Sequence, residues 1–483
     1  MSSAWLGWDG RRLRWRCDRA DAQLLIDGIV YERLSAACDG ERELAFSPTG
    51  NTDIAVSLRD EHDIELAATW RIRIGESTSV GVDAWSGDMH AMRAISRPSI
   101  PRGVDRPVVV VVPIFNAAAL AERCIEAVLR WTSAPARLNL IDDASTESDV
   151  ARVLARYESR GGISIIHNTS NLGYTRSSNL GIAAAGDADV VLLNSDTQVG
   201  PRWLDRFRAI AYGDESIGTV TAVSDNAGAF TVPELERYCP IPAAWTLEQT
   251  QRALLQRTAC PHPELPTGNG FCMFIKRAML DAVGALDADA FPSGYGEEND
   301  LCQRAERAGF RHVIAGDVFV AHARSASFGD ARRAALGAQG MNVLRQRYPD
   351  YEEKVGAILF SFERRVLDYR VRRIYADSDN VYASQPPLPR VLMVGQGEPL
   401  DGFDTFRADA NSIFCCVDSA WQPVGDIDSA SLVDHAIELI AVMDARDADR
   451  WRALGASASV PVTMGSPTAT WNSLAAFGSV VAP

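Results

Sequence analysis

Long apolar segments are scarce in this 483-residue sequence. The longest apolar run, "VVVVVPIF" at 108–115, is far shorter than the ~20 residues that a membrane-spanning helix requires. The opening segment "MSSAWLGWDGRRLRWRC" has no continuous apolar core of the kind found in signal peptides. These absences predict a soluble, cytoplasmic protein with no transmembrane segment, and they leave peripheral contact with the inner face of a membrane open.

Paired cysteines and an excess of positive charge are also missing. The nine cysteines include no C-x-x-C pair and follow no regular spacing, which argues against a disulfide framework and a zinc site. Lys and Arg number 48 against 63 Asp and Glu, a formal net charge of −15. Because general nucleic-acid binding requires a basic surface, nucleic acid is not a predicted partner. An anionic substrate stays compatible with this charge if a metal ion or helix ends neutralise it locally.

The character of the sequence changes along the chain. Residues 1–100 are rich in tryptophan and hold short runs of alternating apolar and polar residues, such as "RLRWRC", which predict a small β-sandwich or barrel. A proline-bearing linker at 96–107 follows. The predicted domains are a β-rich accessory domain at 1–100, an α/β domain at 105–350, a helical connector at 351–384 and a small α/β unit at 385–483.

Strands alternate with helices from residue 108 onward. Strands are predicted at 108–115, 137–143, 163–168, 188–196 and 217–224, with helices between them and an irregular region at 225–266. Ser145 is the predicted cap of the second helix, and Pro201 the first residue of a later one. This rhythm predicts a Rossmann-like, doubly wound and mostly parallel sheet, whose ligands bind at the carboxyl ends of the strands.

Four polar clusters fall at these strand ends. They are "VPIFN" at 112–116, "IDDAS" at 141–145, "NTSNLGYTRSSN" at 168–179 and "LLNSDT" at 192–197. Asp196 is a candidate ligand for Mg²⁺ or Mn²⁺, because such hard cations prefer oxygen ligands and retain phosphate oxygens as partners. Asp143 is a candidate acceptor for the imide N–H of a uracil or thymine ring. The alternative for both is loop capping, since Asp side chains readily accept hydrogen bonds from nearby backbone N–H groups.

The segment "GYGEENDLCQRA" at 294–305 crowds three carboxylates at the start of a predicted helix. Counting ~100° per residue places Glu298 near the middle of the apolar side, Glu297 at its edge and Asp300 pointing largely away. A carboxylate on the inward face must be partnered or functional, because burying it unpaired is costly. Asp300 is expected to be structural and to interact with Arg304.

From about residue 108 to 351 the chain resembles the family-2 glycosyltransferases with the GT-A fold. The motifs that carry the resemblance agree in order, spacing and strand placement; they are "VVVPIFN", "IDDAST", "NLGYTRSSNLGI", "VLLNSDT", "TGNGFCMFIKR", "GYGEENDLCQRA" and "GDVFVAHARSASFG". The rhamnosyltransferase-like members, which build bacterial surface polysaccharides or glycosylate flagellin, are the most similar in character. The resemblance implies inverting transfer of a sugar from a nucleotide-diphosphate donor, with UDP- or dTDP-sugars favoured, to a glycan or protein acceptor, with a divalent metal.

The resemblance also implies roles for individual residues. Glu298 stands where the family usually has the Asp of its "ED" pair and would be the general base. "NSD" at 194–196 would be the metal-binding motif, with Asn194 in place of the usual first Asp, so His322 is the expected second ligand beside Asp196. The residues implied in nucleotide-sugar binding are Pro113, Phe115, Asn116, Asp142, Asp143, Asn171, Gly173, Arg176, Asn194, Ser195, Asp196, Gly268, Asn269 and Glu297. Arg324, Ser325 and Ser327 are further candidates for contact with the donor phosphates.

The acceptor side and the function class are less determined. Residues 267–271 and 225–266 are expected to line the acceptor site, where Trp245 or Phe291 would stack on a sugar or else belong to the core. A sugar nucleotidyltransferase is an alternative, but "VPIFNAAALAER" lacks the glycine-rich, Lys-bearing loop that a triphosphate requires. A non-catalytic nucleotide-sugar-binding adaptor is another. "GQG" at 395–397 is too short for a dinucleotide fingerprint.

Overall fold

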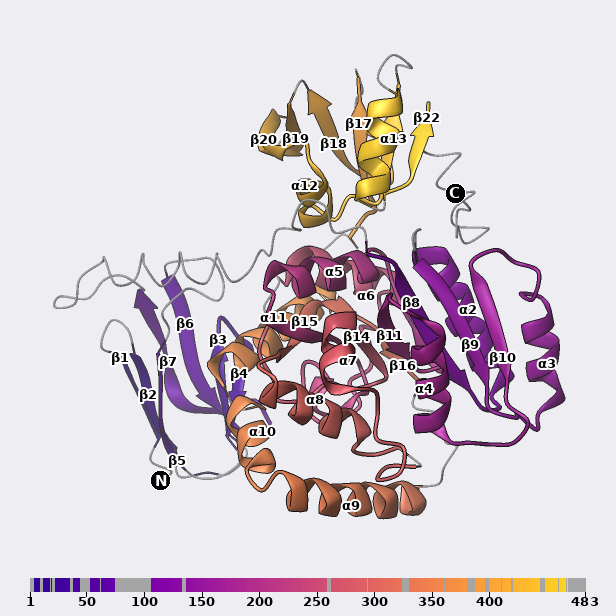
Figure 1. Cartoon of the computed structure of the whole chain (residues 1–483). Helices are drawn as coiled ribbons and strands as arrows, with labels where there is room; N and C mark the ends of the chain where they lie inside the picture. The colour runs from indigo at the N-terminus through magenta and orange to yellow at the C-terminus, as the bar shows by residue number, and fades with distance from the viewer. Residues whose placement is uncertain are drawn as a thin grey trace.

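The computed structural model describes residues 4–467 apart from 9–11, 18, 20–21, 35–37, 44–52, 61, 74–105, 133–135, 259–261, 293, 324–329, 360, 380–386, 396–398, 410, 418–419, 444–447, 459 and 466. Figure 1 shows a large central sheet flanked by helices, with the N-terminal strands on one side and a smaller sheet at the C-terminal end. Among the described helices, none combines the length and the apolar character needed to cross a bilayer.

The central sheet has seven strands in the order β10-β9-β8-β11-β14-β13-β15. Their bounds are β8 (Val108–Ile114), β9 (Ala136–Asp142), β10 (Ile163–His167), β11 (Asp189–Leu193), β13 (Ile217–Val223), β14 (Cys272–Ile275) and β15 (Arg311–Phe319). Within this sheet only β14 runs antiparallel to its neighbours, β11 and β13. The predicted class, a mostly parallel α/β sheet with a β-rich unit before it and a small α/β unit after it, is confirmed.

The apolar run of β8 divides its side chains between the two faces of the sheet. Val108, Val110 and Val112 pack in one core with helices α2 (Ala118–Trp131), α3 (Ser148–Ala155), α5 (Trp203–Gly213) and α6 (Leu247–Arg257). Val109 and Val111 pack in a second core with α4 (Tyr174–Ala184), α7 (Arg277–Val283) and α8 (Glu297–Arg307). Successive residues of a strand point to opposite faces, so a strand covered on both faces is apolar throughout.

Three local expectations were wrong. Ser145 does not cap α3, whose N-cap is Glu147. Pro201 lies before α5, whose N-cap is Arg202. The region 225–266 is not irregular throughout, because it contains α6. Thr246 and Gln249 form a capping box at the start of α6, a pattern that is visible in the sequence as T-x-x-Q.

Two antiparallel sheets near the N-terminus share one core. Their orders are β1-β2-β5 and β4-β3-β6-β7, from β1 (Ala4–Trp8), β2 (Arg12–Cys17), β3 (Gln23–Ile26), β4 (Ile29–Arg33), β5 (Cys38–Glu43), β6 (Asp53–Arg59) and β7 (Glu65–Arg73). Trp15 is buried in this core and is therefore no surface platform for a glycan. Trp85 lies outside the described residues.

Helices after the central sheet join it to the N-terminal sheets. They are α9 (Asp330–Arg347), α10 (Tyr351–Leu359) and α11 (Phe362–Asp379). On α11, Tyr369 packs in the N-terminal core while Leu367 and Val371 pack in the central one. Because α11 contributes to both cores, the N-terminal sheets are fixed to the central one rather than merely tethered.

The C-terminal sheet has the order β20-β19-β18-β17-β21-β22. Its elements are β17 (Arg390–Val394), β18 (Asp404–Asp409), β19 (Ser412–Val417), β20 (Ala420–Asp426), α12 (Ser429–Asp434), β21 (Leu439–Val442), α13 (Ala448–Ser457) and β22 (Val462–Met464). Arginines of α5 and α6 reach into this unit: Arg206 contacts Asp434 at 3.4 Å, and Arg252 binds both carboxylate oxygens of Glu438 at 2.7 and 2.8 Å.

Replacing Arg252 by methionine is expected to lower the free energy of unfolding by about 3–5 kcal/mol, because it leaves the buried carboxylate of Glu438 without its partner. Both side chains of this pair are only 3% exposed. The exposed pair Arg345–Glu352 supplies the control, since Arg345→Ala is expected to cost under about 1 kcal/mol. Urea unfolding of both variants checks the prediction, and equal small losses would contradict it.

Candidate functional site

Loops from distant parts of the chain meet at one edge of the central sheet. The strands β8, β9, β11, β13 and β15 run in the same direction, so their carboxyl ends lie at this edge. Because β14 runs the other way, the loop that precedes it, 267–271, lies at the same edge. The polar clusters at 112–116, 141–145 and 192–197 are therefore brought together with "TGNGF", where an open α/β sheet binds its ligands.

Asp196 and His322 are held side by side by a short strand pair. The strands β12 (Thr197–Gln198) and β16 (Ala321–His322) pair antiparallel, with Thr197 opposite His322. The backbone N–H of Ala323 also donates to the carbonyl of Asp196 at 3.0 Å. This pairing places Nε2 of His322 3.2 Å from Oδ1 of Asp196.

The surroundings of His322 fix the orientation of its ring. Nδ1 lies 3.0 Å from the carbonyl oxygen of Asn226, so Nδ1 carries the hydrogen and donates it. Phe271 stacks on the imidazole with 5.5 Å between ring centroids and 17° between planes. In the neutral ring the lone pair is then on Nε2, which faces Asp196. A backbone carbonyl that sets the tautomer in this way is typical of metal-binding histidines.

The donor set of this pair fits a divalent cation. A carboxylate oxygen and an imidazole nitrogen are ligands of Mn²⁺, and Mg²⁺ takes carboxylates together with substrate phosphates. Both side chains are mostly buried yet retain some exposure, 14% for Asp196 and 11% for His322. The pair is therefore not fully enclosed by the protein.

Asp225 and Asn226, in the segment predicted to be irregular, also lie at the candidate site. Oδ1 of Asp225 accepts hydrogen bonds from the backbone N–H of His322 at 2.9 Å and from the Ser224 hydroxyl at 3.1 Å. Burial raises the pKa of Asp225 despite these hydrogen bonds. "SDN" directly follows β13, so the rule of polar residues at strand ends was sufficient to find them.

The "NSD" segment is anchored on both sides. The backbone N–H of Asn194 donates to the carbonyl of Phe271 at 3.0 Å, and the Asn194 carbonyl accepts from the Thr197 hydroxyl at 2.7 Å. Cys124 contacts the same carbonyl from α2, and burial raises the pKa of its thiol to about 12. A thiol held protonated in this way is not a metal ligand. Asn194 and Ser195 are half-buried beside Asp196.

The first two strand-end loops are locked together. Oδ1 of Asn116 accepts hydrogen bonds from the backbone N–H groups of Thr146 and Glu147, at 2.8 and 3.0 Å, and so ties the loop after β8 to the segment that leads into α3. The Ser145 hydroxyl accepts from the backbone N–H of Asn116. Burial raises the pKa of Asp142, but hydrogen bonds from Ser145 and His167 bring it below its usual value. Pro113 and Phe115 flank this turn and are half-buried.

Asp143 acts within the protein as a loop anchor. Its buried carboxylate accepts from the side-chain amide of Asn168 at 2.8 Å and from the backbone N–H groups of Leu172 and Gly173 at 2.7 and 2.9 Å. This is the loop-capping alternative considered above, and it fixes the start of α4. Gly173 has φ +83°, and a side chain there would lie 2.6 Å from the carbonyl oxygen of Pro292. Asn171 is exposed at the edge of the same loop.

Glu298 is held in place by the "TGNGF" loop. The backbone N–H of Gly270 donates to Oε1 of Glu298 at 3.0 Å, and the Tyr174 hydroxyl donates to the Gly270 carbonyl at 3.3 Å. A Cβ at position 270 would lie 2.6 Å from Oε1 of Glu298, so a side chain there would displace Glu298 from this hydrogen bond. Glu298 is half-buried. The same loop carries Phe271, which stacks on His322, so it connects Glu298 with the Asp196–His322 pair.

The predicted order of burial on α8 was wrong. Glu297 and Asp300 are buried, 2% and 0% exposed, whereas Glu298 is half-buried. The expected contact of Asp300 with Arg304 is present at 2.8 Å, and Asp300 also binds Arg347 at the end of α9 and the hydroxyl of Tyr348, the next residue. Periodicity assigned Asp300 to the solvent face, but α9 covers that face.

Glu297 lies next to the predicted base. Its Oε2 accepts from the backbone N–H of Gly296 at 3.0 Å, and its side chain is hydrogen-bonded to Glu298. Burial, followed by the negative charge of Glu298, raises the pKa of Glu297 well above its usual value and favours its protonated form. The pair can thus consist of a carboxylic acid that donates to a carboxylate, which stabilises one orientation of Glu298.

The remaining candidates are placed as follows. Arg176 is exposed and pairs with Asp289 at 3.3 Å. Gly268 is buried against Met273, and Oδ1 of Asn269 accepts from the backbone N–H of Phe271. Trp245 and Phe291 are buried, 6% and 2% exposed, and belong to the core. Arg324, Ser325 and Ser327 lie outside the described residues.

Residues 109–290, which include the first four polar clusters and the "TGNGF" loop, match Glycosyl transferase family 2. This segment is a glycosyltransferase family 2 domain. The matched range contains Asp196 and ends before Glu298 and His322, so the roles of those two residues rest on the geometry described above.

The family 2 domain also has relatives of known name. The chain is 26% identical over 340 residues to the pre-mycofactocin glycosyltransferase of Mycobacterium tuberculosis, in strains CDC 1551 / Oshkosh and ATCC 25618 / H37Rv. The match covers 68% of this chain and 66% of the relatives, so the chain spans just under two thirds of their length.

Two solved structures are similar at a greater distance. The mannosyltransferase PcManGT from Pyrobaculum calidifontis, in complex with GDP-Man and Mn²⁺, has 19% identity and a TM-score of 0.40 over 62% of this chain and 83% of its own. GalNAc-T7 with UDP, GalNAc and Mn²⁺ has 15% identity and a TM-score of 0.36 over 50% and 53%. Similarities this distant assign no role to any residue of the glycosyltransferase domain.

Proposed function

We propose that the chain is an inverting, metal-dependent glycosyltransferase that moves a sugar from a nucleotide-diphosphate donor to a hydroxyl group of a glycan or protein acceptor. The observation that carries the proposal is the loop 267–271 of the family 2 domain. One of its residues donates to Glu298 and the next stacks on His322, which faces Asp196. A carboxylate and a carboxylate–imidazole pair suited to a divalent cation thus lie at one sheet edge, which supports the proposal.

In the proposed reaction Glu298 is the general base. Its carboxylate removes the proton of the acceptor hydroxyl while that oxygen forms a bond to the anomeric carbon. The bond between the anomeric carbon and the diphosphate oxygen breaks, and the nucleoside diphosphate leaves with the electron pair. The hydrogen bond from the Gly270 N–H, with Glu297 adjacent, keeps Glu298 oriented toward the acceptor.

Asp196 and His322 are the proposed ligands of Mn²⁺ or Mg²⁺. A cation held by these two side chains would supply positive charge to stabilise the leaving diphosphate. Asn226 and Phe271 hold His322 in the orientation that this role requires. The strand-end loops at 113–116, 142–143 and 171–176, together with 194–196 and 268–269, are the proposed nucleotide-sugar site.

The donor and the biological setting belong to the same proposal. UDP- or dTDP-sugars are the favoured donors, and assembly of a bacterial surface polysaccharide or glycosylation of flagellin is the proposed context. A cytoplasmic location is proposed with it, with contact at the inner face of the membrane left open.

A thermal-shift screen of the full chain tests the proposal. UDP-, dTDP- and GDP-sugars are compared with nucleoside triphosphates, each with and without Mn²⁺. A nucleotide sugar is expected to raise the melting temperature in a concentration-dependent, Mn²⁺-dependent way, because a ligand at 100 times its Kd stabilises the native state by about 2.7 kcal/mol. Stabilisation by triphosphates alone would favour a nucleotidyltransferase, and no stabilisation by any sugar nucleotide would overturn the proposal.

A further inference from the structure

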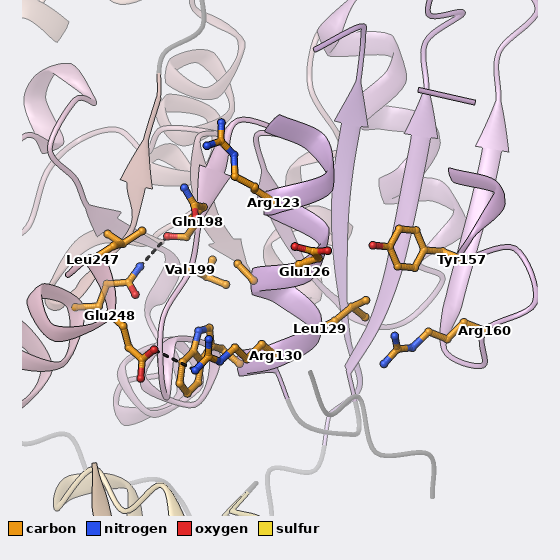
Figure 2. A pocket seen from close by; sticks show the side chains of 13 residues that line it. Arg123, Glu126, Leu129, Arg130, Tyr157, Arg160, Gln198, Val199, Leu247 and Glu248 are labelled. Carbon is orange, nitrogen blue, oxygen red and sulfur yellow. Dashed lines mark hydrogen bonds and ion pairs between the residues drawn. The ribbon is translucent and has the colours of Figure 1, made fainter. Parts of the chain in front are cut away.

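A groove of about 490 Å³ runs along the outer face of α2, bordered by the residues after α3, by β12 and by the start of α6 (Figure 2). Small-molecule sites typically occupy ~300–1,000 Å³. None of its thirteen described lining residues belongs to the predicted donor, metal or base set. We call it the α2 groove.

The lining of the α2 groove contains both positively charged hydrogen-bond donors and negatively charged acceptors. Arg123, Arg130 and Arg160 supply donors, and Glu126 and Glu248 supply acceptors. A guanidinium group has only donors and an ionised carboxylate only acceptors. An anionic ligand would be repelled by the glutamates and a cationic one by the arginines. A neutral polyhydroxyl ligand satisfies both, because each hydroxyl both donates and accepts.

Two aromatic rings add an apolar surface to this polar lining. Trp131 is half-buried, with the Arg130 guanidinium 4.6 Å from its ring centroid. Tyr157 is mostly buried, and Figure 2 shows its hydroxyl directed toward Glu126. Burial raises the pKa of Tyr157, and the charge of Glu126 raises it further. Flat aromatic rings beside paired polar groups match a sugar ring, which has apolar C–H faces and a polar edge.

The groove is held in shape before any ligand binds. Arg130 is fixed by Glu248 at 3.1 Å, and Glu248 in turn binds Arg252, whose guanidinium reaches Glu438 of the C-terminal sheet. Side chains that are already ordered lose little conformational entropy when a ligand binds.

From these observations we infer that the α2 groove binds neutral saccharide units. We assign these units to the part of the acceptor glycan that does not react, and this assignment rests on the proposed function.

The groove is also connected to the candidate site through β12. Gln198 and Val199 line it, directly after Thr197, which pairs with His322. The side-chain amide of Gln251 donates to the Gln198 carbonyl at 2.8 Å. A glycan in the groove therefore contacts the strand that follows Asp196.

Saturation-transfer NMR and calorimetry on the full chain, without nucleotide or metal, test this inference. The probes are the neutral trisaccharides maltotriose, cellotriose and mannotriose, with glucuronate and inorganic phosphate as anionic comparisons. At least one neutral trisaccharide is expected to bind with a millimolar Kd, and the double variant Arg123→Ala/Glu126→Ala is expected to weaken it at least tenfold. Both side chains are exposed on α2, so the fold is retained. Arg152→Ala, an exposed change on α3 outside the groove, is the control and should leave the Kd unchanged.

The outcomes separate this inference from the proposed function. Glu298→Gln should retain trisaccharide binding. If the parent chain binds a trisaccharide but transfers no sugar from any nucleotide-sugar donor, the proposed function is contradicted and the groove assignment is not. Binding of glucuronate or phosphate only, or of no trisaccharide, would overturn the groove assignment. If transfer occurs, the groove variant should raise KM for long acceptors at least tenfold and leave kcat and the KM of a monosaccharide acceptor unchanged. An equal loss on both acceptors would also overturn it.

Discussion

Glu298→Gln is expected to lower kcat for sugar transfer by about 10²- to 10⁴-fold while the Kd of the donor stays unchanged. Glutamine has the size of glutamate, and its amide oxygen still accepts the hydrogen bond that the Gly270 N–H donates at 3.0 Å. The loop 267–271 and its contact with His322 should therefore persist. What the variant loses is a carboxylate that removes the acceptor proton. Single-turnover rates at saturating donor, with donor binding measured separately by calorimetry, check both parts.

Two companion variants sharpen this test. Glu306→Gln changes a half-exposed glutamate on the same helix, paired with Lys354, and should leave kcat unchanged. Glu298→Asp restores the residue that the resembled family usually carries but shortens the side chain by one methylene. Because proton transfer depends on geometry at the scale of ~1 Å, we expect an intermediate kcat. Full activity of Glu298→Gln would remove Glu298 from the role of base.

The sheet edge could be predicted because parallel strands deliver their carboxyl ends to one place. Asp142, Asn194 and Asp196 each follow a buried apolar run, and the structure brings all three to that edge. The same rule applied to β13 points to Asp225, which was missed only because the following region has no simple periodicity. The contact of Asp196 with His322 needed the resemblance, since two two-residue strands carry no pattern of their own.

The misplacement of Asp300 has a different cause. Periodicity shows which face of a helix is apolar. It does not show whether another helix covers a different face, or whether polar side chains make the contact there. Helix α9 packs on the face of α8 that was assigned to solvent, and the end of α9 with the next residue supplies Arg347 and Tyr348 to the buried carboxylate. Likewise, Glu297 is buried with its carboxylate bound to the backbone N–H of Gly296 and beside Glu298, an environment that two adjacent glutamates in a sequence do not reveal.

The second large effect concerns Asp196 and His322. Asp196→Ala and His322→Ala are each expected to weaken Mn²⁺ binding by about 100-fold or more, since even the loss of an outer-shell partner costs 10–100-fold in metal affinity. Mn²⁺ titrated into the chain with nucleoside diphosphate, followed by calorimetry and by the melting temperature, measures this without any turnover. Asp350→Ala removes an exposed carboxylate that pairs with Lys354 and should leave the Mn²⁺ affinity unchanged.

Melting temperatures of the same two variants without Mn²⁺ distinguish metal ligands from a structural ion pair. If Asp196 and His322 served only to hold β12 against β16, either substitution would lower the melting temperature without Mn²⁺ and leave Mn²⁺ affinity as it was. The geometry favours the role of metal ligands. The Asn226 carbonyl accepts the Nδ1 hydrogen, so the Nε2 lone pair of the neutral ring is directed at the carboxylate of Asp196. Two acceptors 3.2 Å apart are stabilised when a cation binds both, so Mn²⁺ should stabilise the parent chain more than either variant.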